Sequence, residues 1–219
     1  MFLFRSFLPL LIGVFIFPLS AWCQGAYSGE DYFEGTIEYR FYVGGKEGEI
    51  LKEMNPIDFM NFHISEGNYI VHLYGRTVRN PKQIAKPFAT TRVFLADSNQ
   101  MYLVDPKNAR YFVDDGYDPE QDMPPPAIPT GDSMLILNQM CSEYKVEKEN
   151  DTIIYYVSNK VKANTAYFPD STNARANFLT YGLQGRIPLM TIRRNPQRTI
   201  KVKATNIHRR ELDKSQFLI

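Results

Sequence analysis

Apolar and polar residues alternate in several short segments of this 219-residue chain, and this alternation constrains the fold more than any other feature. In residues 33–43, every second residue from Ile37 to Val43 is aliphatic or aromatic, and Glu38 and Arg40 lie between them. Successive side chains of a strand point to opposite faces, so a period of two places these apolar residues on one face. The segment therefore predicts a half-buried strand.

Ten further segments show strand patterns, and most are joined in pairs by residues that favour turns. Residues 59–64 and 68–74 flank a turn in which Gly67 can adopt a positive φ, which indicates a hairpin. Within residues 152–157, the run from 153 to 157 is continuously apolar, as in a strand that is covered on both faces. The other expected strands are residues 91–95, 100–104, 110–113, 133–137, 141–147, 187–193 and 199–207.

Consecutive strands usually pair with each other, so these segments predict a mainly β fold with an antiparallel sheet built from meanders. A short helix is expected at residues 173–181, where Gly182 can form the C-terminal cap. Asn55 and Pro56 can open a second short helix or a turn. We assign residues 24–32 to a flexible N-terminal segment and residues 33–219 to a single β-rich domain.

Residues 114–131 interrupt the strand pattern with five acidic residues and five prolines. Proline lacks the backbone donor that the interior of a strand or helix needs. We therefore expect an exposed loop that is acidic and proline-rich. Calcium binding by its carboxylates is an alternative, which is disfavoured because the ligand order of an EF-hand loop is absent.

The first 23 residues predict a removable secretion signal. Residues 7–19 are apolar apart from two prolines and one glycine, and they follow Arg5. The apolar run is shorter than the roughly 20 residues that a membrane-spanning helix needs. We therefore expect an exported protein of the periplasm or cell envelope, without a stable transmembrane span after processing.

Cleavage of the signal is expected between Cys23 and Gln24, because Ala21 and Cys23 occupy the two positions that signal peptidase reads. A lipoprotein with a lipid on Cys23 is the first alternative. Trp22 disfavours it, since a small residue is required immediately before a lipidated cysteine. An uncleaved anchor is the second alternative.

Charge is balanced in the mature chain. Removal of the signal would take away one of the 25 basic residues, Arg5, and none of the 24 acidic residues. A nucleic-acid partner is therefore not expected, because such proteins carry a basic surplus. A local surplus near the C-terminus is a candidate surface for an anionic lipid or an acidic protein, and the alternative is an edge hairpin protected by cations. Its residues are Arg186, Arg193, Arg194, Arg198, Lys201 and Lys203.

No linear motif of a nucleophile, a phosphate loop or a metal site is present, so we expect neither an enzyme nor a cofactor. Cys141 would be the one cysteine of the mature chain, and we interpret it as a buried small hydrophobe. His63 and His72 flank the first hairpin and can face each other across it, and His208 is distant in sequence. We expect structural or surface roles for these histidines.

Four packing patterns resemble those of an uncharacterised family of exported Bacteroidota proteins that is related in outline to the lipoprotein carriers of the LolA/LolB-like group. The patterns lie in residues 33–39, 101–105, 136–146 and 182–217. The resemblance implies a strongly curved antiparallel sheet, an incomplete barrel, with one or two short helices or loops over its concave side. Such a concave side can hold an acyl chain.

Two functions follow as hypotheses. The first is an exported binding module of the cell envelope that holds a lipid or other hydrophobic ligand in the half-barrel. The alternative is a non-catalytic structural or protein-interaction domain of the periplasm with a filled core, whose partner is another envelope protein. A cavity of several hundred Å³ would favour the first hypothesis.

Overall fold

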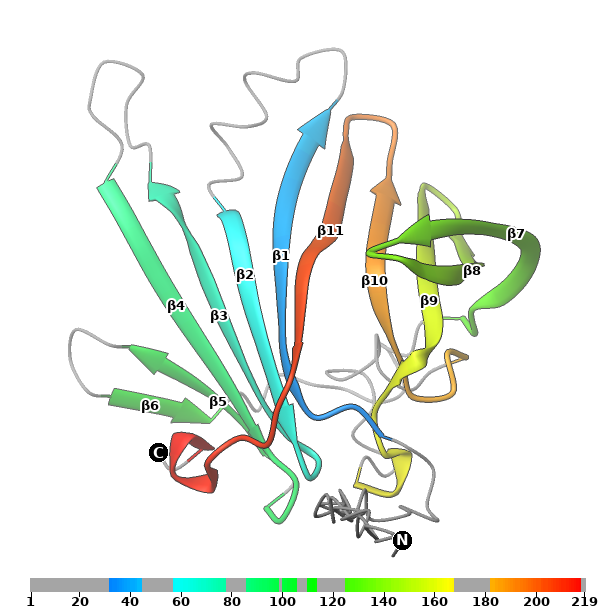
Figure 1. Cartoon of the computed structure of the whole chain (residues 1–219). Helices are drawn as coiled ribbons and strands as arrows, with labels where there is room; N and C mark the ends of the chain where they lie inside the picture. The colour runs from blue at the N-terminus through cyan, green and yellow to red at the C-terminus, as the bar shows by residue number, and fades with distance from the viewer. Residues whose placement is uncertain are drawn as a thin grey trace, which may run out of the picture. The chain divides into compact units, whose positions relative to one another are not determined.

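Eleven strands form one antiparallel sheet in the computed structural model (Figure 1). The structure describes residues 32–44, 57–77, 86–98, 100–105, 110–113, 125–167 and 182–217, which belong to one unit, Asp31–Ile219. The strands are β1 (Gly35–Gly44), β2 (Ile57–Ser65), β3 (Asn68–Thr77), β4 (Lys86–Leu95), β5 (Gln100–Asp105), β6 (Arg110–Val113), β7 (Ile128–Ile136), β8 (Gln139–Lys148), β9 (Asp151–Lys162), β10 (Arg186–Arg194) and β11 (Thr199–Arg209). Two short 3-10 turns are also described, η1 (Thr165–Tyr167) and η3 (Lys214–Phe217).

The strands that come first and last in the sequence, β1 and β11, pair with each other near the centre of the sheet. The strand order is β6-β5-β4-β3-β2-β1-β11-β10-β9-β8-β7, so every pair except β1–β11 joins strands that are consecutive in sequence. The β1–β11 pair therefore separates two meanders, which we call the first arm (β2–β6) and the second arm (β7–β10). In Figure 1 the two arms extend to opposite sides of β1 and β11.

All eleven expected strands are confirmed, because each segment with a strand pattern coincides with one of the observed strands. The hairpin at Gly67 is confirmed in detail. Ser65 pairs with Asn68, and the two residues between them have positive φ, 45° at Glu66 and 83° at Gly67. Two-residue turns of this kind match the twist of antiparallel strands. A Cβ at Gly67 would lie 2.2 Å from Cβ of Tyr167, so η1 can pack directly against this turn.

The end of the expected loop at residues 114–131 needs a correction, because β7 already begins at Ile128. Two features let a strand form there despite its proline. β7 is an edge strand, and its register with β8 is interrupted between Pro129 and Ser133 around Gly131, which has φ 90°. The side chains of residues 125, 126 and 128–131 are exposed, whereas Ala127 is buried at 7% exposure. Residues 114–124 lie outside the described residues.

Several other expectations concern residues that the structure does not describe. These are the signal sequence with its cleavage site at Cys23 and Gln24, the rest of the segment before residue 32, the turn at Asn55–Pro56 and the helix at residues 173–181. The division into a signal, a flexible segment and one domain stays a prediction. Within the described residues, no helix is long and apolar enough to cross a membrane.

The two faces of the sheet have different environments. The pocket face carries Tyr39 and Phe41 of β1, and the outer face carries Thr36 and Glu38 of the same strand. Much of the core lies on the pocket face, with Phe62, Tyr69 and Phe94 almost fully buried. On the outer face, Leu212 and Phe217 of the C-terminal segment pack on Ile70 and Val93, and this cluster covers part of the first arm.

The sheet is curved and open, which confirms the expected incomplete barrel. Strands β6 and β7 form its two edges, and they do not pair with each other. Side chains from β2–β5 and from β9–β10 nevertheless line one common hollow, so the two arms bend towards each other on the pocket face. The described helical segments are the short turns η1 and η3, and neither was among the helices expected from the sequence.

Candidate functional site

A hollow of ≈ 360 Å³ lies on the pocket face between the two arms, and we call it the pocket. This volume is within the range of about 300–1,000 Å³ that is usual for small-molecule sites. Strands β1–β5 and β9–β11 all contribute side chains to it. Most of the side chains that line it are aliphatic or aromatic, including Phe41, Met60, Val71, Leu73, Ile153 and Val202.

The alternation in the sequence explains why these side chains share one face. Val71 and Leu73 of β3 are two residues apart, as are Met60 and Phe62 of β2, and Ile153 and Tyr155 of β9. A period of two points each pair to the same side of the sheet. Antiparallel pairing then brings the pairs together, since Phe62 lies opposite Val71 in the register of β2 and β3.

The deep end of the pocket consists of aromatic and sulfur-containing side chains. Tyr69 and Phe62 are 1% exposed, and Met101 is 7% exposed. The Tyr69 ring lies 5.6 Å from the Phe62 ring and stacks on Phe94 at 5.1 Å between ring centroids. Aromatic pairs at these distances are stabilising beyond the area that they bury. The pocket therefore has a mainly aromatic floor.

Tyr39 connects the two halves of the sheet across the pocket wall. Its hydroxyl donates a hydrogen bond of 2.9 Å to the backbone oxygen of Pro188 in β10, although β11 lies between β1 and β10. Ala204 is the β11 residue opposite Tyr39, and its small side chain lets the ring pass over that strand. Burial raises the pKa of Tyr39 far above its ordinary value, so this phenol is a neutral donor.

Two arginines are the charged residues among those that line the pocket, and they come from opposite arms. Arg92 of β4 is exposed, and within the described part of the chain its side chain has neither a hydrogen bond nor an ion pair. Arg193 of β10 is bound by Asp151, with Nε and Nη2 each 2.6 Å from the carboxylate oxygen Oδ2. Burial raises the pKa of Tyr155, which lines the pocket from β9.

The six basic residues singled out in the sequence do not gather at one place. Arg193 lines the pocket, whereas Lys201 lies on the outer face with its Nζ 5.4 Å from the centre of the Tyr42 ring. Arg194 and Lys203 also lie on the outer face, because each is the sequence neighbour of a residue that lines the pocket, Arg193 or Val202. At the opposite end of β10, the Arg186 guanidinium lies 4.8 Å from the Tyr144 ring, and its Nε donates to the oxygen of Leu183. Arg198 is half-buried in the β10–β11 turn. Their role as an anion-binding surface stays a prediction.

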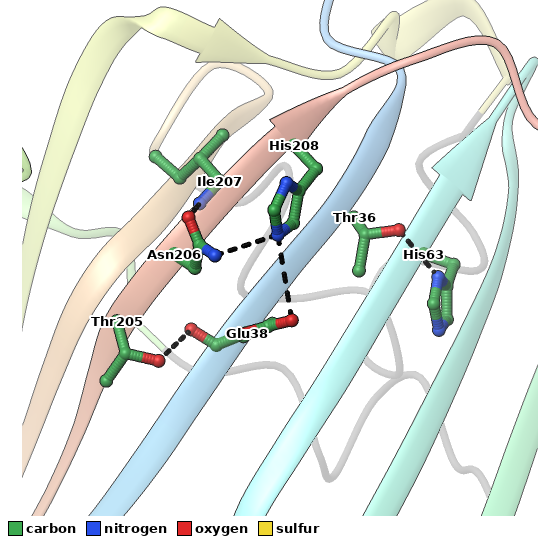
Figure 2. A network of polar contacts seen from close by, with 7 residues as sticks. All are labelled: Thr36, Glu38, His63, Thr205, Asn206, Ile207 and His208. Atoms are coloured by element: carbon green, nitrogen blue, oxygen red, sulfur yellow. Dashed lines mark hydrogen bonds and ion pairs between the residues drawn. The ribbon is translucent and has the colours of Figure 1, made fainter.

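All three histidines of the chain lie on the outer face; His63 and His208 share one row across the sheet, and His72 lies opposite Asn61 in the adjacent row. His208, Thr36 and His63 are direct neighbours in the register of β11, β1 and β2. Figure 2 shows the polar contacts of this row. His63 Nδ1 lies 2.8 Å from Thr36 Oγ1, and His208 Nε2 lies 3.7 Å from a carboxylate oxygen of Glu38 and 2.8 Å from Asn206 Nδ2. No group of three or more metal-ligating side chains occurs in the described residues.

The expected approach of His63 and His72 is confirmed. Their ring centroids are 5.3 Å apart, and the Nδ1 atom of His72 lies 2.9 Å from Thr91 Oγ1. Burial is the main cause that lowers the pKa of His63 to about 4, and the charges of His72 and Arg210 lower it further. Burial also lowers the pKa of His72. Both imidazoles are therefore neutral near pH 7 and accept or donate hydrogen bonds within the sheet.

Cys141 is a buried thiol, as expected. Its side chain in β8 is 0% exposed and belongs to the main apolar cluster. Burial raises the pKa of the thiol to about 11, so the reactive thiolate is disfavoured.

Sequence reasoning missed Arg92 as a residue that lines the pocket, although the strand pattern contained a signal for this location. Arg92 and Phe94 are two residues apart in β4, so both point to the same face of the sheet, and Phe94 is only 3% exposed. A cation that alternates with core residues on one face is a candidate pocket residue. The partner strands supply the apolar neighbours Val71 and Leu103.

Comparisons with known proteins give distant similarities only. No protein-family model and no curated protein matches the chain. Among solved structures, it is similar to LprF from Mycobacterium bovis with a TM-score of 0.35 and 10% sequence identity, over 80% of this chain and 85% of that chain. It is also similar to PNGF-II in two space groups, P21 and C2. The TM-scores are 0.47 and 0.45 at 15% identity, over 85% and 83% of this chain.

The chain matches 30% and 29% of the length of the two PNGF-II chains, so it corresponds to a minor part of that protein. Similarities at this level do not assign a family or an activity. The proposals below therefore rest on the geometry of the pocket.

Proposed function

We propose that this protein is a binding module of the cell envelope that holds a lipid or another hydrophobic ligand in the pocket between the two arms. The observation that carries the proposal is a hollow of ≈ 360 Å³ whose lining is mainly aliphatic and aromatic. A ligand that covered this lining would remove apolar surface from water, which contributes about 25 cal/mol for each Å².

The location of the polar groups supports a binding role over a catalytic role. The Tyr39 hydroxyl is hydrogen-bonded to the backbone oxygen of Pro188, and the Arg193 guanidinium is hydrogen-bonded to Asp151. Catalysis by a nucleophile would need a base within hydrogen-bond reach of it. The three histidines are the natural bases of the chain, and they lie on the outer face, away from the pocket. We therefore propose a non-catalytic function.

The envelope location rests on the apolar N-terminal segment that predicts a secretion signal, with cleavage expected after Cys23. The open, curved antiparallel sheet agrees with what the resemblance to the carrier-like exported family implies. Membership of that family, its Bacteroidota origin and export itself are parts of the proposal. A chain released into the envelope would meet lipids that have to cross an aqueous space.

A protein-interaction domain is the second candidate, and one observation favours it. The tip of the β7–β8 hairpin exposes Leu135 (64%), Leu137 (40%) and Met140 (65%). Exposed apolar groups at the tip of a hairpin are typical of a surface that contacts another molecule. The pocket counts against the filled core that this candidate requires.

Filling the pocket with a larger side chain tests the proposed function. Leu73→Trp places an indole in the pocket, and its neighbour Tyr74→Trp is the matched control, because Tyr74 stacks on Phe59 on the outer face. Native mass spectrometry of the full chain, purified after export, should detect lipid on the parent protein and on the control. It should detect at least tenfold less on Leu73→Trp.

Loss of bound lipid from both variants alike would contradict the location of the site. A parent protein that carries no lipid, and whose melting temperature no added lipid raises, would overturn the proposed function. Comparable circular dichroism spectra of the three proteins establish that the pocket variant is folded.

A further inference from the structure

The geometry points to an anionic amphiphile as the ligand of the pocket, with Arg92 as the residue that binds its head group and the apolar tail directed to the floor of the pocket. This inference rests on the proposed function and names the class of ligand. It depends on the charges that line the pocket, on the way each is compensated, and on where they lie relative to the apolar floor.

The charge of the pocket lining is positive. Arg92 and Arg193 belong to the lining, and no aspartate or glutamate is among the described residues that line it. The nearest acidic partner, Asp151, binds Arg193 from outside that lining with its side chain 14% exposed. The pocket therefore presents one compensated and one uncompensated guanidinium.

Arg92 is the uncompensated cation. Within the described residues its guanidinium makes no hydrogen bond or ion pair, and its neighbours on the same face are Val71 and Leu103 in the partner strands. A ligand that covers these apolar neighbours also removes water from the guanidinium. Desolvation of an unpaired charge is unfavourable, so a neutral hydrophobic ligand forfeits part of its binding free energy at this position. An anionic group on the ligand avoids this loss.

The chemistry of the guanidinium defines the head group. Its planar donors match the oxygens of a carboxylate or a phosphate, which it can bind with two parallel hydrogen bonds. Arg193 can reinforce the positive potential from the opposite arm, but its Nε and Nη2 already contact Asp151. We therefore assign the direct contact to Arg92.

Burial sets the orientation of the ligand. Phe62, Tyr69 and Met101 are between 1% and 7% exposed and form the deep end, whereas Arg92 is exposed at the rim. An amphiphile places its apolar chain where water is excluded and its charged group where the arginine remains accessible. The acyl tail then points to the aromatic floor, and the head group stays at β4.

A comparison of three ligands with hydrocarbon chains of similar length tests the inference. Laurate and dodecyl phosphate carry a carboxylate and a phosphate, and 1-lauroylglycerol is neutral. Isothermal titration of the full chain, below the micelle-forming concentration of each ligand, should give about tenfold tighter binding for the two anions, as one charge-assisted bond provides. The preference for a carboxylate or a phosphate identifies the head group.

Arg92→Gln should abolish that preference by weakening the two anions about tenfold and leaving the neutral ligand within twofold. Arg40→Gln is the matched control, since Arg40 is exposed and lies on the outer face between the pocket-lining residues Tyr39 and Phe41. It should leave all three affinities unchanged. Arg92→Lys keeps the charge and should restore part of the preference. Equal melting temperatures of the parent and Arg92→Gln establish that the fold is intact.

The possible failures are distinguishable. If the neutral ligand binds as tightly as the anions to the parent protein, or if Arg92→Gln retains the preference, the assignment of an anionic ligand to Arg92 is overturned and the hydrophobic pocket stands. If none of the three ligands binds, while the protein carries no endogenous lipid, both the inference and the proposed function are overturned.

Discussion

Two histidines on the outer face and Arg92 on the pocket face differ in how their side chains are paired. On the outer face, His63 and His72 each have a threonine hydroxyl within 2.9 Å. On the pocket face, the exposed Arg92 has no such partner among the described residues. Paired groups stabilise the fold, and an unpaired cation is available to a ligand. The two histidines therefore contribute to the stability of the fold, and Arg92 is the residue that we assign to binding.

His63 makes the stability of the fold dependent on pH. Its pKa is about 4 in the folded chain and near 6.5 in an unfolded chain. The unfolded state therefore binds a proton more readily, so the stabilising contribution is fully present above pH 6.5 and is lost as the pH falls towards 4. The site is half-buried, and after allowance for solvent screening we expect a loss of about 1 kcal/mol.

Urea unfolding between pH 7 and 4 checks this prediction. His63→Asn should flatten the decline in the free energy of unfolding over this range, because the titrating group is removed. His208→Asn is the control, since His208 is exposed on the same face. An unchanged slope for His63→Asn would contradict the assigned role.

At the scale of elements, local patterns were sufficient to predict every strand, but they were not sufficient for the turns and edges. Strand positions depend on the alternation of neighbouring residues, which the sequence displays directly. The start of β7 was missed because Pro129 and Gly131 are typical of loops, and only an edge position with an interrupted register accommodates them. Whether a strand lies at the edge of a sheet depends on the pairing order of all its strands, which no local pattern shows.

The β7–β8 turn contains a residue that is poorly suited to its conformation. Leu137 and Asn138 have φ of 48° and 60°, and the same two-residue geometry at Glu66–Gly67 ends in glycine. Leucine rarely adopts positive φ, whereas asparagine does so readily. Leu137→Asn should therefore raise the free energy of unfolding by about 0.5–1 kcal/mol.

Thermal and urea unfolding measure this gain. Leu135→Asn is a matched control, because it removes an exposed leucine of the same hairpin at a position without positive φ. A gain shared by both variants would show that loss of exposed apolar surface, and not relief of the turn, is responsible. Reduced stability of Leu137→Asn would contradict the prediction outright.

At the scale of the whole molecule, the pocket depends on contacts that no local pattern reveals. The β1–β11 pair joins residues such as Ile37 and Ile207, which are far apart in the chain, and it unites two meanders that would otherwise be separate sheets. Register shifts at residues 38–39 and 186–190 then adjust the direction of the strands. Periodicity along the chain predicts which faces are apolar, but not how far the arms bend towards each other.

Tyr39 provides a measurable link between this architecture and the pocket. Its hydroxyl holds Pro188 across β11, so Tyr39→Phe leaves a buried carbonyl oxygen without its partner and should lower the free energy of unfolding by about 1–2 kcal/mol. Because Tyr39 and Pro188 both line the pocket, lipid affinity should fall in the same variant. Tyr42→Phe, on the outer face and 47% exposed, should change neither quantity. Urea unfolding and lipid titration of both variants measure the two effects. If stability falls while affinity is retained, the hydrogen bond supports the sheet but does not shape the pocket.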